Sequence, residues 1–156
     1  MKKRSKYRPR PVHLDTMLLV KSGILAFSKV PEGLSLRIKN NDSLNNIRLG
    51  VGTRYDVEII RHALNVTEAL GRLGKGSVWA DEIKAGQAAL KAVANRGIRN
   101  ELRFITTGPE LTALNLAMEI HDAQLDVCTV QDIERAAAMV VREIKHKRAE
   151  PLLEKI

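Results

Sequence analysis

The stretch TRYDVEIIRHALNVTEALGRLG, residues 53–74, decides the fold because it holds the start, the apolar faces and the end of one long helix. Thr53 and Asp56 are three residues apart, as in a capping box, with Asp where Glu or Gln is usual. Gly71, Gly74 and Gly76 stop the helix. Between these signals run two adjacent apolar stripes, which are Val57, Ile60, Leu64 and Thr67, and Ile59, Ala63, Val66, Leu70 and Leu73. So wide an apolar face predicts a central helix.

Three more helices are predicted after this one, and a hydroxyl residue opens each of them. Ser77 caps a helix that ends near residues 95–97, and Thr107 opens one that runs to about Val127. Thr129 caps the last helix, which extends to Arg148. Because the intervening loops are short, neighbouring helices are expected to be antiparallel. The predicted fold class is mainly α, a bundle of about four longer helices.

Upstream of the bundle, the hydrophobic pattern alternates. Leu34, Leu36 and Ile38 are separated by polar residues, which is the period of a half-buried strand. Pro-Glu-Gly at 31–33 is suited to a hairpin loop, so a small β-hairpin is predicted over residues 24–39. We expect a flexible basic arm at 1–13 followed by a single helical domain at 14–156. The hairpin edge and the alanine-rich face at 85–92 predict a homo-oligomer.

The positive charge is concentrated at the start of the chain. The formal net charge is +8, yet the first ten residues carry six cations and no acid. Such a segment repels itself and cannot bury enough apolar surface to fold alone. Tyr7 stands among the cations, where it could stack on a base or anchor the arm against the body. The residues predicted to bind nucleic acid or another polyanion are Lys2, Lys3, Arg4, Lys6, Tyr7, Arg8 and Arg10. The alternative is a solubilising tail that binds nothing specific.

Length and composition narrow the classes of protein to consider. With 156 residues, the chain suits one compact domain. Cys128 is its single cysteine, which rules out an intramolecular disulfide framework and fits a reducing compartment. The longest apolar run, 136–141, is far below the roughly 20 residues of a membrane span. We therefore expect a cytoplasmic protein with no membrane partner.

One stretch has the residue types of a metal site. His121 and Asp122 are adjacent on a predicted helix and resemble the metal pair of HD-type phosphohydrolases, with His62 as a conceivable upstream ligand. That family also needs a distant downstream Asp, whereas the Asp residues that follow Asp122 are Asp126 and Asp132, which are too close along the chain. A histidine on the apolar stripe of this helix is more simply a core residue bonded to a neighbouring helix. No catalytic residue, metal or cofactor is predicted.

Three segments resemble a group of small uncharacterised proteins encoded by bacteriophages and prophages. They are the arm pattern KR-x-KY-x-P-R-P, residues 36–40 and residues 116–126. The resemblance implies a phage-encoded accessory protein that acts in the bacterial host cytoplasm. It carries no catalytic residues across.

Three hypotheses about function follow. The first is a non-enzymatic protein that binds nucleic acid through its arm. The second is an inhibitor or adaptor that modulates a host protein, with the arm on an acidic surface of its partner. The third, held more weakly, is an HD-like metal-dependent phosphohydrolase.

Overall fold

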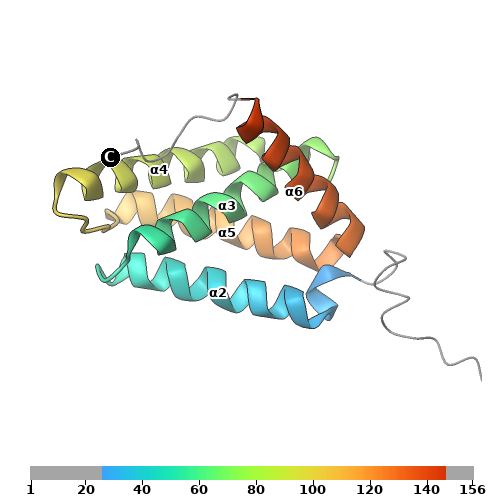
Figure 1. Ribbon diagram of the computed structural model, residues 1–156, viewed down its shortest axis with the longest axis horizontal. Helices are drawn as coiled ribbons and strands as arrows, with labels where there is room; N and C mark the ends of the chain where they lie inside the picture. The colour runs from blue at the N-terminus through green and yellow to red at the C-terminus, as the bar shows by residue number, and fades with distance from the viewer. Residues whose placement is uncertain (1–25, 147–156) are drawn as a thin grey trace, which may run out of the picture.

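The computed structural model describes residues 26–146. Residues 26–146 form five α-helices, which confirms the mainly α class, and Figure 1 shows the last of them lying across the others. The α-helices are α2 (Pro31–Arg48), α3 (Arg54–Arg72), α4 (Ala80–Arg99), α5 (Gly108–Val127) and α6 (Val130–Lys145), with short 3-10 turns η1 (Phe27–Lys29) and η2 (Ser77–Trp79). None of the described helices is long and apolar enough to cross a membrane.

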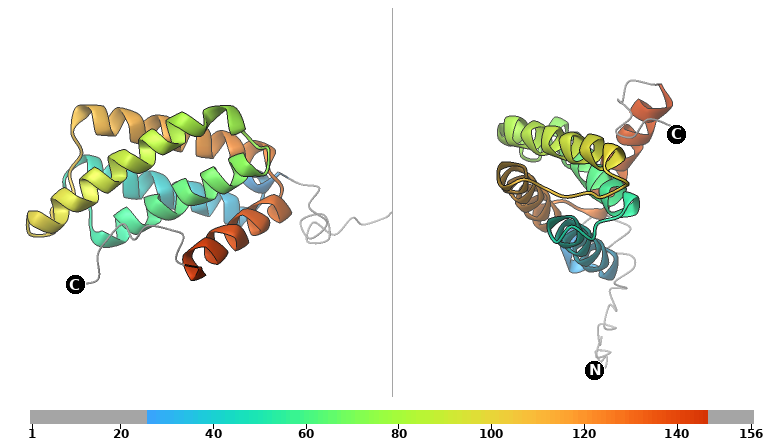
Figure 2. Two further views of the ribbon diagram at one scale, coloured as in Figure 1. Left: turned by 90° about the horizontal axis from the view of Figure 1, so that it is seen from above. Right: turned by 90° about the vertical axis from the view of Figure 1, so that its left-hand side faces the viewer.

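Helix α3 is the centre of the bundle, as its two apolar stripes predict. It packs against α2, α4, α5 and α6, and the end-on view in Figure 2 shows it between α2 and α4. Its residues Val57, Ile60 and Leu64 are buried in the main core with Leu90 of α4 and Leu114 of α5. A second apolar cluster, around Leu70, Cys128 and Val140, attaches α6.

The predicted hairpin over 24–39 is wrong. Residues 31–48 form α2, which has Pro31 in its first turn, where a missing amide hydrogen costs no helical bond. The alternating Leu34 and Ile38 are also four residues apart, so they share one helix face, and that face is exposed. Residues 40–42, which directly follow the predicted hairpin, lie inside the same helix. The hairpin edge therefore gives no support to the predicted oligomer.

The caps at the helix starts follow the sequence signals in most places. The Thr53 amide donates to the Asp56 carboxylate at 2.8 Å, and the Asp56 amide donates back to the Thr53 hydroxyl. Thr107 and Thr129 begin α5 and α6 in the same way. Ser77 is different, because it lies in η2 and α4 begins three residues later, at Ala80.

Two glycines of α4 allow close packing that a side chain would prevent. A Cβ at Gly86 would lie 2.5 Å from the Cβ of Ala117 on α5. A Cβ at Gly97 would lie 2.2 Å from the buried ring of Phe104. These contacts bring α5 and the loop before it directly against α4.

Candidate functional site

The arm residues predicted to bind nucleic acid, Lys2 to Arg10, lie outside the described residues. The charge of residues 26–146 can still be compared with the charge of the segment that precedes them. Residues 26–146 contain 16 Lys and Arg against 15 Asp and Glu, so this part is almost neutral. Residues 1–25 contain seven cations and one acid, and therefore hold most of the excess positive charge.

His121 is a core residue and not a surface ligand. It is 1% exposed, and its Nδ1 lies 2.8 Å from the Thr67 hydroxyl of α3. That hydroxyl donates its own hydrogen to the Ala63 carbonyl, so the imidazole must donate from Nδ1. Its Nε2 has no hydrogen-bond partner among the described residues. The ring is therefore the neutral Nδ1–H tautomer.

The environment of His121 also explains its protonation. Burial, followed by the nearby charges of Arg37 and His62, lowers its pKa to about 4. The imidazole is thus uncharged at neutral pH. It connects α5 to α3 through the hydrogen bond with Thr67, as the core interpretation of this residue predicts.

Asp122, next in sequence, faces a different helix. Its carboxylate lies 3.4 Å from the Arg37 guanidinium of α2, which also contacts Asp126 at 3.0 Å. Burial raises the pKa of Asp122, although the Arg37 charge opposes the shift. Asp122 and Arg37 attach α2 to α5.

The third metal candidate, His62, is exposed on α3. Partial burial and the neighbouring Arg61 charge lower its pKa. Among residues 26–146, no group of three or more His, Cys, Asp or Glu side chains could hold a metal ion. The structure therefore does not gather His62, His121 and Asp122 into one donor set.

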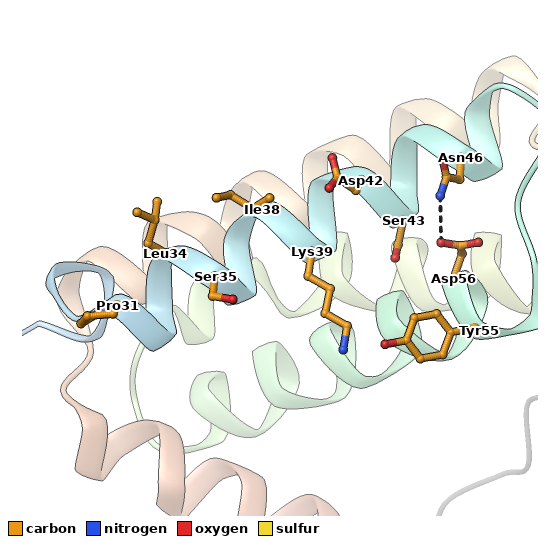
Figure 3. A pocket seen from close by; sticks show the side chains of 10 residues that line it. All are labelled: Pro31, Leu34, Ser35, Ile38, Lys39, Asp42, Ser43, Asn46, Tyr55 and Asp56. Atoms are coloured by element: carbon orange, nitrogen blue, oxygen red, sulfur yellow. Dashed lines mark hydrogen bonds between the residues drawn. The ribbon is translucent and has the colours of Figure 1, made fainter.

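An open groove lies on α2, and the sequence gives no sign of it when this segment is interpreted as a hairpin. The groove has a volume of about 720 Å³ and runs from the start of α2 to the start of α3 (Figure 3). The i, i+4 pair Leu34 and Ile38, read as a helix, would have indicated it. Its lining residues are Pro31, Leu34, Ser35, Ile38, Lys39, Asp42, Ser43, Asn46, Tyr55 and Asp56.

Both apolar and polar side chains line the groove. Leu34 and Ile38 point outward from α2, and both are more than half exposed. The Lys39 ammonium lies 5.1 Å from the centre of the Tyr55 ring, within cation–π range. These side chains can offer a partner apolar contact and hydrogen bonds.

Asp56, one of the acidic residues in the groove, already accepts hydrogen bonds from its neighbours. Burial raises the pKa of Asp56, but hydrogen bonds from Thr53 and Asn46 outweigh it and hold the pKa below its ordinary value. Asp56 is therefore a cap residue that stays ionised.

Comparisons of the chain with protein-family models, with curated proteins and with solved structures found no match.

Proposed function

We propose that this protein is a non-enzymatic accessory protein, of the kind bacteriophages encode, which binds nucleic acid through its N-terminal arm. One observation carries the proposal: six cations and no acid stand in the first ten residues, ahead of a described body that is almost neutral. Phosphate contacts supply most non-specific affinity for nucleic acid, and they require unpaired Lys and Arg. The first ten residues are the part of the sequence richest in Lys and Arg.

The aromatic residues of the body favour the arm as well. Phe27 and Phe104 are buried, so neither can form a stacking platform for bases. Trp79 and Tyr55 are exposed, but Tyr55 lies on the α2 groove and Trp79 on η2, far apart in sequence. Tyr7 remains the aromatic residue surrounded by cations.

Fluorescence anisotropy with labelled duplex DNA, single-stranded DNA and RNA tests the proposal. The full chain is compared with a deletion of residues 1–11 at several salt concentrations. We expect the deletion to lose most of its affinity for every probe at low salt. Equal affinity of the two proteins would contradict the proposal.

We infer a second function, binding of another protein, as an inhibitor or adaptor would. The supporting observation is that large apolar side chains, such as Leu34 and Ile38, are exposed in groups on the described surface. Grouped apolar exposure of this kind is typical of interaction sites. Stoichiometric co-purification of one bacterial protein, retained after nuclease treatment, would support this function. Recovery of the chain alone, or of partners that nuclease removes, would contradict it.

A further inference from the structure

The second exposed apolar group lies at the end of the bundle where α2 and α4 end and α3 and α5 begin, on the left in Figure 1. Two loops meet there. Gly52 and Phe104 form an isolated antiparallel bridge, and a Cβ at Gly50 would lie 3.3 Å from the Ile105 side chain. We call this place the loop-end surface. It comprises the apolar residues Leu49, Val51, Leu102 and Ile105 and the cations Arg48, Arg54, Arg99 and Arg103.

The four apolar side chains are turned to solvent, each between 44% and 65% exposed. Because Phe104 points into the core, its neighbour Ile105 points outward, as alternate residues do in extended chain. The antiparallel bridge places Val51 opposite Ile105, so the two side chains are neighbours on the outer face. Val51 and Ile105 thus form an exposed apolar pair, and Leu49 and Leu102 are exposed in the same two loops.

Leu102 lies in an exposed turn whose backbone conformation is unfavourable for leucine. The Arg103 amide donates to the Asn100 carbonyl at 3.0 Å, and the two residues between them, Glu101 and Leu102, have φ of 52° and 64°. Two successive positive φ values are typical of a type I′ turn, where Asn-Gly is the favoured pair. The chain therefore bears both backbone strain and apolar exposure at Leu102. Strain of this kind is concentrated at functional sites.

The cations around this apolar group are free to meet a partner. Arg54, Arg99 and Arg103 form no ion pair with any described residue, and Arg48 bonds only the neutral amide of Asn45. Of the three acids in these loops and helix starts, two are engaged. Asp56 caps α3, as described above, and Glu110 binds Arg96 and the Thr107 amide. Glu101 alone partly offsets the four arginines.

We infer that the loop-end surface is a docking site for another protein that presents acidic residues around an apolar centre. An apolar centre with a polar rim is the anatomy of protein interfaces, and arginine is enriched in them. Charge complementarity selects the partner. The chain's own basic arm and a second copy of this surface would both bring cations against arginines, and phosphate contacts would not require the aliphatic side chains.

The inference rests on the proposed protein-binding function and names its surface and the chemistry of its partner. A random peptide library displayed on phage, selected on the immobilised full chain, provides the test. We expect enriched peptides that combine Asp or Glu with Leu, Ile or Phe. A synthetic peptide of the enriched sequence should bind Leu102→Gly about tenfold more weakly than the wild type, and Arg54→Glu/Arg103→Glu by at least as much.

Two control variants separate the possible outcomes. Ile38→Ser removes an equally exposed apolar side chain from the α2 groove, and Lys3→Ser/Arg4→Ser/Lys6→Ser weakens the arm. Neither should change the affinity for the peptide. Loss of binding in Ile38→Ser but not in Leu102→Gly would overturn the inference while leaving the protein-binding function standing.

Other results would also overturn it. Enrichment of no peptide contradicts both the inference and the protein-binding function. Binding that depends on the arm variant alone assigns the acidic peptide to residues 1–13. Self-association lost in Leu102→Gly, measured by sedimentation equilibrium, makes a second copy the occupant. Nucleic-acid binding that falls in Arg54→Glu/Arg103→Glu while peptide binding does not makes this end a phosphate site.

Discussion

The His121 imidazole of α5 donates a hydrogen bond to the Thr67 hydroxyl of α3, with 2.8 Å between Nδ1 and Oγ1. The direction is fixed because Thr67 donates its own hydrogen to the Ala63 carbonyl. Gln124, one turn further along α5, donates to the Thr67 carbonyl at 3.1 Å. One polar residue of α3 is thus held by two residues of α5 inside an apolar core, and a charge at this place would be costly.

Acid should therefore destabilise the protein through His121 before the carboxylates titrate. The folded-state pKa of about 4 lies below the ordinary value of 6.5, so the unfolded chain binds the extra proton. Stability should be constant above about pH 6.5 and fall by roughly 2 kcal/mol by about pH 4.5. Urea unfolding followed by circular dichroism at several pH values measures this change.

The variant His121→Leu provides the comparison, since it has no proton to bind at this position. We expect it to be less stable than wild type at neutral pH but to lose much less stability on acidification. His62→Gln removes a second histidine whose pKa is lowered in the folded state, so it should lose part of the wild-type dependence but keep the larger part, which comes from His121. A wild-type curve that is parallel to that of His121→Leu would show that the buried imidazole is not the acid-sensitive group.

Gly97→Ala should destabilise the bundle, because the new methyl group would lie 2.2 Å from the Phe104 ring. Overpacking of this kind costs about 1–3 kcal/mol. Gly108→Ala is the matched control, since nothing lies within 4 Å of a Cβ at that position. Because alanine has a higher helix propensity than glycine, the free energy of unfolding of Gly108→Ala should be unchanged or higher by up to about 1 kcal/mol. Equal melting temperatures of the two variants would contradict the packing of Phe104 on α4.

Leu102→Gly should raise the free energy of unfolding by about 1 kcal/mol, because glycine adopts a positive φ without strain. If Leu102 stabilised the fold, the substitution would lower the free energy of unfolding instead. Stability gained together with peptide binding lost is the combination expected of a strained functional residue. Thermal unfolding of the full chain measures the first part, and Ile105→Ser, at a position without positive φ, should show no gain.

Helix α2 shows why part of the fold could not be predicted from the sequence. The alternation of Leu34, Leu36 and Ile38 predicts a strand, yet the buried face of α2 is made largely of small and polar residues, including Gly33, Asn40 and Ser43. Hydrophobic periodicity assumes that apolar residues face the core. Here two of them face solvent, so the pattern indicates the wrong period.

Helix α3 shows the opposite case. Its capping box, its wide apolar face and its stop near Gly71 all agree, and the structure has the helix at 54–72. For the candidate site, His121 could be placed on the buried stripe of α5, but its partner Thr67 is 54 residues away, which no local pattern indicates. The loop-end surface likewise depends on a tertiary contact, the bridge between Gly52 and Phe104.

The salt dependence of DNA binding tests the central proposal most directly. If all six arm cations contact phosphates, the logarithm of the affinity of the full chain for duplex DNA should fall with the logarithm of salt concentration with a slope of about −5. Lys3→Ser/Arg4→Ser/Lys6→Ser should reduce the slope to roughly −3. The matched control Lys84→Ser/Arg142→Ser/Lys145→Ser, which removes three exposed body cations, should keep the wild-type slope. A slope that the arm variant leaves unchanged, or that the body variant reduces instead, would contradict binding through the arm.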